Sequence, residues 1–405
     1  MKLAIFSNAP WTGTGYGTQV AELAPRLKSQ GHEVAVVANY GLAGSVLDWN
    51  GIPVLPQGYD GWSNDIAGAH IRNFVGDNGY GLTLYDVWTI KGPLWDDTKL
   101  AAWVPIDHDP CPEPVAQWFK EGKHPRIAIA MSKFGKARLE AEGIQGVHYA
   151  PHAINTRLFS PEGTNFRSNL GIPESGVHVT VVNAANKGLP PRKSWGELLQ
   201  AWGAFAQRHS DAWLYLHTES LGLASGVNII RLLKATKCPL DRVRIVPQYQ
   251  YRAGIPTEEM PQVYRMGSVL LSPSRGEGFG IPVIEAQACG LPVITNNWTA
   301  QPELTDPGSG WLVEGQQEWD EGMASWFSAP NVDSIIAALE ASYASNGDQE
   351  RAQSARKFAE QYDSGTIFES HWLPILADLE QRLTPPLNRE QRRDARRAAL
   401  KGGQR

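Results

Sequence analysis

Few cysteines and no long apolar run set the first limits on this chain. Its 405 residues include only Cys111, Cys238 and Cys289, an odd number at wide spacing, which argues against a disulfide framework and against a zinc site made of cysteines. We therefore expect a reducing compartment and a cytoplasmic location. No apolar run is long enough to span a bilayer. The apolar run in residues 1–7 is too short for a signal peptide and predicts a first strand.

Strong charge and short repeats are also lacking. The net charge of −5 is mild and favours neither a membrane surface nor nucleic acid as the partner of the main body. Instead of a fixed repeat, short apolar runs alternate with helical patterns, which is typical of βαβ units and parallel sheets. A chain of 405 residues exceeds what one hydrophobic core normally serves, so we expect two domains of α/β class.

The alternation predicts two sets of strands. The first set covers residues 3–7, 33–38, 82–85, 103–106, 127–131 and 147–150, and the second covers 177–183, 213–217, 243–246, 269–272 and 292–295. The clearest early helix is 18–30, which has one apolar face and Gly31 as its stop; later helices are expected at 332–343, 352–362 and 368–383. Doubly wound sheets hold ligands at the carboxyl ends of their strands, where each motif below falls.

The most informative segment is residues 273–286, PSRGEGFGIPVIEA. It follows a short apolar strand, and Pro282 stands where a helix can begin, so Glu277 and Glu285 bracket a strand-to-helix turn. Glycines allow backbone N–H groups to approach a ligand, and the helix N-terminus favours an anion. The segment predicts a site for phosphate and hydroxyl groups. The alternative is structural: Glu285 complements the helix dipole and Glu277 lies in a loop.

This segment resembles the Glu-x7-Glu signature of retaining glycosyltransferases of the GT-B fold, family 4, and the likeness continues through residues 289–294, CGLPVI. The resemblance implies that Glu277 contacts hydroxyls of the transferred sugar and that Glu285 holds the ribose of a nucleotide donor. It also implies that Gly278, Phe279 and Gly280 bind the donor, with backbone donors at Phe279 and Gly280.

A glycine-rich loop, residues 8–17 with the sequence NAPWTGTGYG, follows the first strand. Its spacing is not Gly-x-Gly-x-x-Gly, and no acidic residue closes the second strand, which disfavours a dinucleotide site. In the resembling family this loop lies against the donor diphosphate, which implicates Gly15, and helps to receive the acceptor. Trp11 and Tyr16 either stack on a sugar or base there or cover the loop.

His108 lies in IDHDP, residues 106–110, at the end of a predicted strand. By its residue type alone it is a metal ligand, a general base or a turn residue. Partners with zinc spacing are lacking, which argues against a metal. The resemblance implies that His108 reaches the donor sugar near the bond that breaks, and we expect it to position that sugar.

Residues 183–194, NAANKGLPPRKS, follow the first strand of the second set. Ser194 and Glu197 have the spacing of a capping box, which predicts a helix over 195–208. Cations near a helix N-terminus interact unfavourably with the helix dipole. Their presence there therefore indicates either a bound diphosphate or a solvated basic loop. The family pattern is Gly-Arg followed by Lys; Asn186 and Lys187 replace Gly-Arg, and Lys193 fits the lysine. The basic residues are Lys187, Arg192 and Lys193.

Two weaker matches support the alignment: residues 150–161, APHAINTRLFSP, in which His152 and Asn155 depart from the family, and 296–304, NNWTAQPEL, in which paired glycines are missing. The resemblance implies two Rossmann-like domains facing a central cleft. We expect an acceptor-side domain at 1–160, a linker at 161–176, a nucleotide-sugar domain at 177–362, and a crossover helix at 363–383 that returns to the first domain. A basic, mobile tail is expected at 384–405.

The implied reaction is retaining transfer of a sugar from a UDP- or GDP-sugar, without a metal, with lysines neutralising the leaving diphosphate. The default acceptor is a saccharide, lipid or small-molecule hydroxyl. A hydroxymethylated DNA base, approached with help from the basic tail, and a protein hydroxyl are rivals. The other classes left open are a nucleotide-sugar epimerase and a non-catalytic sugar-binding relative.

Overall fold

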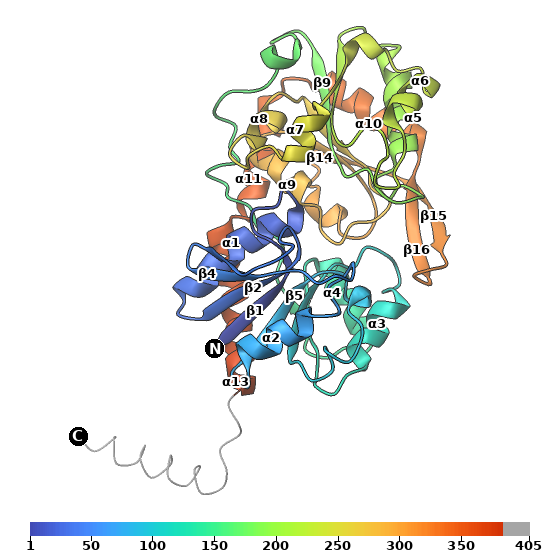
Figure 1. Ribbon diagram of the computed structural model, residues 1–405. Helices are drawn as coiled ribbons and strands as arrows, with labels where there is room; N and C mark the ends of the chain where they lie inside the picture. Colours follow the sequence, from blue (N-terminus) through green and yellow to red (C-terminus); the bar gives the residue numbers. More distant parts are fainter. Residues whose placement is uncertain (384–405) are drawn as a thin grey trace, which may run out of the picture.

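The computed structural model describes residues 1–383 as two lobes stacked on each other (Figure 1). The predicted basic tail at 384–405, and with it the hypothesis of DNA binding, lies outside the described residues. Each lobe is built around a sheet, one of eight strands and one of six. The α/β prediction of two Rossmann-like domains in the GT-B arrangement is confirmed.

The amino-terminal sheet has the order β3-β4-β2-β1-β5-β6-β7-β8, and all its pairs are parallel except β3 with β4. Apolar strands fill its centre, as expected for a sheet covered on both faces. The strands are β1 (Lys2–Asn8), β2 (Glu33–Tyr40), β3 (Leu47–Trp49), β4 (Ile52–Leu55), β5 (Gly79–Leu84), β6 (Leu100–Val104), β7 (Ile127–Ala130) and β8 (His148–Tyr149). The helices are α1 (Gly15–Ser29), α2 (Ala67–Val75), η1 (Val87–Thr89), α3 (Glu113–Lys120) and α4 (Lys133–Ala141).

The second sheet has the order β11-β10-β9-β12-β13-β14 and is wholly parallel. Its strands are β9 (His178–Asn183), β10 (Ala212–His217), β11 (Val243–Ile245), β12 (Val269–Ser272), β13 (Val293–Asn296) and β14 (Gly310–Val313). The helices around it are α5 (Trp195–Ala206), α6 (Ile229–Ala235), α7 (Gln248–Ala253), α8 (Met260–Arg265), α9 (Ile281–Ala288), α10 (Val332–Ala344) and α11 (Gln349–Glu360). Short 3-10 turns are η2 (Ser168–Leu170), η3 (Leu240–Arg242) and η4 (Pro302–Leu304).

Local signals explain the ends of the first helix. The Thr14 side chain accepts a hydrogen bond from Gly17 N, so it caps α1 directly after the glycine-rich loop. At the other end Gly31 has a φ of 85°, a left-handed conformation that suits glycine and ends the helix. The predicted 18–30 helix is therefore confirmed, and its start lies at the cleft.

The predicted capping box at the start of α5 is wrong. Ser194 is left-handed, with a φ of 53°, and its side chain makes no capping bond. Its hydroxyl is buried without a hydrogen-bond partner among residues 1–383. Glu197 instead pairs with Arg275 at 2.6 Å. The Ser-x-x-Glu spacing is present, but Glu197 is used to hold the neighbouring β12–α9 turn.

An antiparallel hairpin, β15 (Gly315–Asp320) and β16 (Ser325–Pro330), extends from the carboxyl-terminal lobe towards the other lobe (Figure 1). The sequence patterns gave no indication of it. Asp109 and Trp326 exchange both backbone hydrogen bonds, at 3.1 and 3.2 Å. Ser325 also donates to the Pro110 carbonyl at 2.5 Å. The hairpin thus fastens the loop after β6 to the second lobe.

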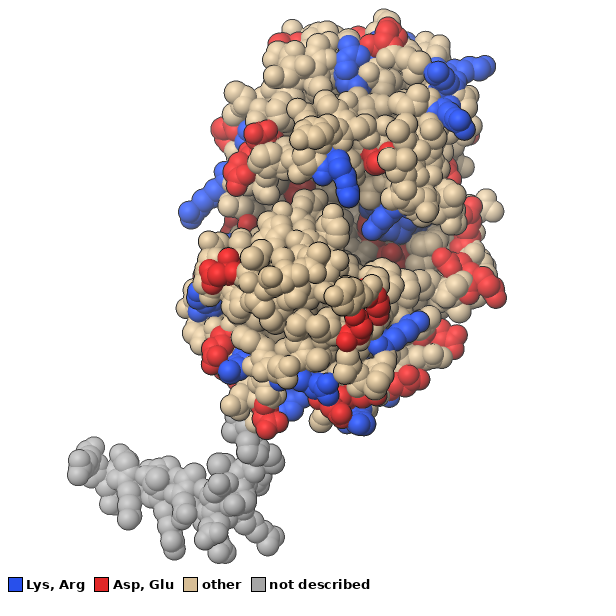
Figure 2. All heavy atoms as spheres, viewed as in Figure 1, with Lys and Arg blue, Asp and Glu red and all other residues tan. Residues whose placement is uncertain are grey.

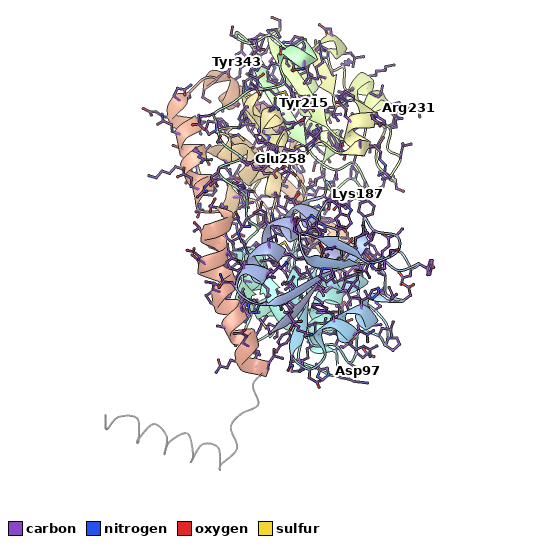
Figure 3. The ribbon with its side chains drawn as sticks, turned by 60° about the vertical axis from the view of Figure 1, so that its left-hand side comes forward. Asp97, Lys187, Tyr215, Arg231, Glu258 and Tyr343 are labelled. Carbon is purple, nitrogen blue, oxygen red and sulfur yellow. The ribbon has the colours of Figure 1, made fainter. Side chains whose placement is uncertain are left out.

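The last helical segment runs down the side of the amino-terminal lobe (Figure 3). It comprises α12 (Ser364–Ile367), a π-helical turn (Phe368–Trp372) and α13 (Leu373–Leu383). Trp372 packs edge-on against Trp103 of β6, with ring centroids 4.9 Å apart, and Asp378 contacts His148 of β8 at 2.9 Å. The predicted return of this helix to the first domain is confirmed.

Candidate functional site

Glu277 lies where the β12–α9 turn meets the loop before α5. Its carboxylate is 2.8 Å from the Arg192 guanidinium and pairs directly with the Lys193 ammonium. The Arg192 Nη1 also donates to the Gly276 carbonyl at 2.5 Å. The two loops are far apart in sequence, and these charged contacts fix them together at the carboxyl ends of β9 and β12.

Burial and charge act in opposite directions on these groups. Burial disfavours an ionised Glu277, but the charges of Arg192 and Lys193 outweigh that effect and lower its pKa to about 2. Burial lowers the pKa of Lys193, and Glu277 opposes that shift. Burial alone would lower the pKa of Arg192, but the charges of Glu277 and Asp107 outweigh that effect and raise it. Glu277 is therefore an anion at neutral pH.

The glycines of this turn permit contact between the lobes. A Cβ at Gly276 would collide with the Asp107 carbonyl, and one at Gly278 with Pro105, both in the loop after β6. Gly280 has a φ of 123° and precedes α9, where Pro282 occupies the first turn as predicted. Backbone groups of this turn therefore lie directly against the other lobe.

Two other predicted donor residues lie at the same junction. A Cβ at Gly15 would be 3.2 Å from the Ile281 side chain, so the glycine-rich loop touches the start of α9. Phe279 points its ring into the protein: it is 3 % exposed and packs near His152 and Tyr362, with centroids 5.3 and 5.7 Å away. Its side chain is therefore structural, and only its backbone can face a ligand.

His108 is held between the two lobes. Its Nδ1 is 2.7 Å from the Asp107 carboxylate, and its ring lies 3.7 Å, centroid to centroid, from Phe327 of the hairpin. The buried Nε2 has no hydrogen-bond partner among residues 1–383, and Asp320 is 3.7 Å away. Because Asp107 fixes the ring through Nδ1, Nε2 is the atom left for a ligand.

Glu285 is in a different electrostatic setting from Glu277. Its carboxylate accepts a 2.5 Å hydrogen bond from Tyr264, whose hydroxyl accepts one from Asn183 at 2.8 Å. Burial raises the pKa of Glu285 to about 7, and the Tyr264 bond opposes that rise. No cation in the described part of the chain forms an ion pair with Glu285, so the charge of this carboxyl group changes near neutral pH.

Lys187 and its neighbour Asn186 have separate tasks. Asn186 is buried and binds the backbone of Glu219 and Val227 through its side chain, which shapes the loop. Lys187 is exposed at the junction of the lobes (Figure 3). It lies near enough to lower the pKa of Asp86 across the cleft. The substitution of Gly-Arg by Asn-Lys therefore gives one structural residue and one exposed cation.

The opposite wall of the cleft contains residues that no motif identified. Asp86 follows β5, and its pKa is raised to about 6 by burial and by Asp107, against the charges of Arg192 and Lys187. Burial raises the pKa of Tyr16, Asp86 adds to that rise and Arg192 opposes it, which places the glycine-rich loop near both charges. The position of Asp86 at a strand's carboxyl end was the available signal.

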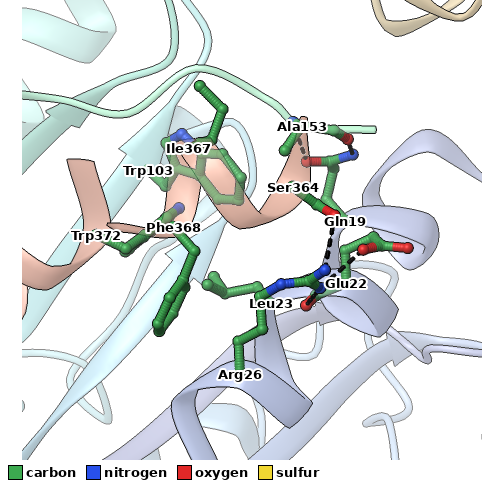
Figure 4. A pocket seen from close by; sticks show the side chains of 10 residues that line it. All are labelled: Gln19, Glu22, Leu23, Arg26, Trp103, Ala153, Ser364, Ile367, Phe368 and Trp372. Carbon is green, nitrogen blue, oxygen red and sulfur yellow. Dashed lines mark hydrogen bonds and ion pairs between the residues drawn. The ribbon is translucent and has the colours of Figure 1, made fainter. Parts of the chain in front are cut away.

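Figure 2 shows a hollow between the lobes with lysine and arginine side chains on its upper rim. A small pocket lies where α1 meets the helical segment that begins with α12 (Figure 4). Arg26 donates to Ser364 there at 2.6 Å, and Gln19 binds the Ala153 backbone. These contacts tie the helix to the first lobe and supply no group for chemistry at the cleft.

Within residues 1–383, no group of three or more histidine, cysteine or acidic side chains has the arrangement of a metal site. The same residues include no helix with both the length and the apolar character needed to cross a bilayer. The three cysteines are buried and unpaired.

Comparison with known proteins gives consistent similarities. Residues 234–342 match the family described as "Glycosyl transferases group 1". The chain is 28% identical over 273 residues to D-inositol 3-phosphate glycosyltransferase of Rhodococcus erythropolis, covering 63% of this chain and 60% of that relative. The alignment therefore spans less than two thirds of the relative's length.

Two solved structures share the fold. Sucrose-phosphate synthase from Thermosynechococcus elongatus superposes with a TM-score of 0.72 and 16% identity, over 95% of this chain and 100% of that one. HepE of Anabaena, in complex with UDP-glucose, superposes with a TM-score of 0.68 and 14% identity, over 93% and 100% of the two chains. At these identities the likeness concerns the fold.

Proposed function

We propose, from the premise that residues 234–342 belong to the glycosyl transferases group 1 family within a GT-B fold, that this protein transfers a sugar from a nucleotide-diphosphate donor to an acceptor hydroxyl. The single observation that supports this most is the contact of Arg192 and Lys193 with Glu277 at the cleft. Two cations there suit a diphosphate, and a carboxylate among them suits sugar hydroxyls.

The donor would lie along the carboxyl ends of the second sheet. Arg192 and Lys193, with Lys187 at the rim, would neutralise the diphosphate, while the backbone at Gly278, Phe279 and Gly280 would donate hydrogen bonds. Glu277 would exchange part of its contact with the cations for hydroxyls of the sugar. Glu285 would accept from the ribose. The likeness of the fold to that of HepE in complex with UDP-glucose supports a nucleotide-sugar donor. A UDP-sugar or a GDP-sugar as the donor stays a prediction.

The chemical step that we propose is retaining. The bond between the anomeric carbon and the diphosphate oxygen breaks, and the acceptor oxygen forms the new bond on the same face of the sugar. The acceptor's proton passes to the departing diphosphate oxygen, so atoms and charges balance without a further reactant. The protein's part is to hold the reactants and stabilise the leaving charge. His108 would position the sugar through Nε2, and no residue has to act as a nucleophile.

The test begins with binding. Calorimetry with UDP, GDP and their glucose, mannose and N-acetylglucosamine derivatives should give saturable binding of one nucleotide series, and release of that nucleotide should be measured with and without acceptors. Anomeric NMR of the product should give the configuration of the donor. Binding without turnover would favour a non-catalytic relative, and nucleotide release unaffected by any acceptor would favour an epimerase. Absence of binding to every nucleotide sugar would refute the proposal.

A further inference from the structure

Four aromatic rings gather on the first lobe's wall of the cleft. Tyr85, the residue after β5, lies 5.6 Å from Tyr16 and 5.8 Å from Trp62, centroid to centroid, and Trp62 lies 6.2 Å from Trp88. These rings come from the three segments that follow β1, β4 and β5, with Tyr16 in the first turn of α1 and Trp88 in η1. Trp62 is 41% exposed, while the other three are partly buried. We call Tyr16, Trp62, Tyr85 and Trp88 the aromatic cluster.

The centre of the aromatic cluster is held rigidly. The Tyr85 hydroxyl accepts from Asn39 Nδ2 at 2.9 Å and donates to Asn8 Oδ1 at 3.1 Å. Asn8 in turn donates to Thr14, the residue that caps α1. This chain of hydrogen bonds fixes the ring between β1, β2 and the glycine-rich loop, so a ligand that stacks there meets a surface that needs little reordering.

Asp86 stands beside Tyr85 with an unused carboxylate. It occupies the position before η1, but its side chain makes no capping bond; its backbone carbonyl accepts from Thr89 instead. Within residues 1–383 the carboxylate takes part in no hydrogen bond or ion pair. An ionisable group that is partly buried without a partner lowers the stability of the protein, which is characteristic of a functional site.

The charges on this wall disfavour an anionic ligand. Asp86 and Asp107 both lie there, and the main cations acting on Asp86 are Arg192 and Lys187 of the opposite, donor-side loop. A phosphate on the acceptor would meet two carboxylates and would compete with the donor diphosphate for the same cations. Aromatic rings with carboxylate acceptors instead suit the apolar face and the hydroxyls of an uncharged sugar ring.

We propose that the aromatic cluster and Asp86 form the acceptor site, and that its ligand is an uncharged saccharide that stacks on Trp62 and donates a hydroxyl hydrogen bond to Asp86. This inference rests on the proposed function and names its substrate class. Asp86 is a positioning residue in this scheme, because the acceptor's proton still passes to the departing diphosphate. The site lies beside the donor through Tyr16, whose loop touches the start of α9.

The first experiment compares matched acceptors with the full-length protein. Nucleotide release from the bound donor is measured without acceptor, then with methyl glycosides of glucose, galactose, mannose and N-acetylglucosamine and the disaccharides maltose and cellobiose, and then with glucose 6-phosphate, mannose 6-phosphate and inositol phosphate. We expect at least one uncharged saccharide to accelerate release and the phosphorylated compounds to be poorer by at least about tenfold in kcat/KM, a difference of about 1.4 kcal/mol. Failure of every uncharged saccharide, or equal use of the phosphorylated ones, overturns the inference.

Variants then locate the site. Trp62→Ala should raise the acceptor KM about tenfold, as expected for loss of one stacking contact. Tyr59→Ala is the control, because Tyr59 belongs to the same loop, is fully exposed and lies outside the aromatic cluster. An acceptor KM that is equal in the two variants would remove Trp62 from the site.

Asp86→Asn tests the charge argument. It should lower kcat/KM for the uncharged saccharide by at least about tenfold and narrow the discrimination against its phosphorylated counterpart, because the repulsive charge is gone. If Asp86 had only a structural role, the variant would lower kcat/KM equally for both acceptors and would also change donor binding. If the donor binds and hydrolyses normally in all variants while no acceptor effect appears, the acceptor site is wrong and the proposed function stands. If the donor does not bind at all, the proposed function itself fails.

Discussion

The two walls of the cleft use the same chemical group in opposite ways. On the wall that we propose binds the donor, called the donor wall, Glu277 lies between Arg192 and Lys193, and its pKa is lowered to about 2. On the wall that we propose binds the acceptor, called the acceptor wall, Asp86 has no ion-pair partner among residues 1–383, and burial raises its pKa to about 6. Both carboxyl groups are shielded from water, so the difference in pKa arises from the neighbouring charges: two cations contact Glu277, whereas Asp107 adds a negative charge near Asp86.

This difference indicates what each wall is suited to bind. The donor wall is a paired charge network, in which a diphosphate would replace one anion by another without leaving buried charge unpaired. The acceptor wall combines aromatic rings with a carboxylate that lacks a counter-ion, so it favours neutral hydroxyl groups. The hairpin β15–β16 joins the walls, because it contacts the loop carrying Asp107 and His108 from the donor side.

The largest expected effect comes from breaking the donor-side network. Lys193→Ala should reduce turnover by at least about 100-fold, comparable to loss of one strong electrostatic donor in a preorganised site. Lys193→Arg, which keeps the positive charge, should reduce turnover less than Lys193→Ala does. Lys234→Ala, at an exposed lysine in α6 of the same lobe, is the control. The measurement is kcat with saturating donor, and near-normal turnover of Lys193→Ala would remove Lys193 from the reaction.

A second change concerns the other donor-side carboxyl group, Glu285. Its pKa of about 7 in the free protein means that its ionised fraction rises as the pH rises through neutrality. A carboxylate accepts ribose hydroxyl bonds more strongly than a carboxylic acid does, so donor affinity should increase by up to about tenfold between about pH 6 and about pH 8.

Calorimetry at several pH values measures this dependence. Glu285→Gln should bind the donor more weakly with a flat profile in that range, whereas Glu258→Gln, at an exposed carboxylate of the same lobe, should retain the wild-type profile. Tyr264→Phe removes the hydrogen bond that opposes the raised pKa, so it should move the midpoint to higher pH. An identical pH profile in wild type and Glu285→Gln would place the titrating group elsewhere.

The donor wall could be predicted from sequence far better than the acceptor wall. Glu277, Glu285 and Lys193 stand in a glycine-rich turn and a basic loop that follow recognisable strands, and those local patterns determine where they lie. Trp62 and Asp86 belong to irregular loops without a motif, and only the folded sheet brings them together. Placement by tertiary structure leaves no short-range signal.

The start of α5 has a misleading sequence pattern, and the strand β15 has no recognisable one. Ser194 and Glu197 have the spacing of a capping box, but the left-handed backbone at Ser194 and the pairing of Glu197 with Arg275 override that local preference. The strand β15 is polar and mostly exposed, so it lacks the apolar alternation that identifies a half-buried strand. Its backbone pairing with β16, and the contact of β16 with Asp109, stabilise it instead.

The smallest expected effect tests the acceptor wall through stability. Because folding raises the pKa of Asp86 from 3.8 to about 6, ionising this carboxyl group costs free energy in the native state. Below about pH 4 it is protonated in both states and the cost is absent; as the pH rises through about 6 the cost reaches its full value. Asp86→Asn should therefore increase the free energy of unfolding by about 1–2 kcal/mol at neutral pH and by little at about pH 4.

Urea unfolding at these pH values measures the difference, with Asp77→Asn, at an exposed site in the same lobe, as the control. A variant that is less stable than wild type at neutral pH would mean that Asp86 has a stabilising partner, and the contrast between the two walls would then be wrong.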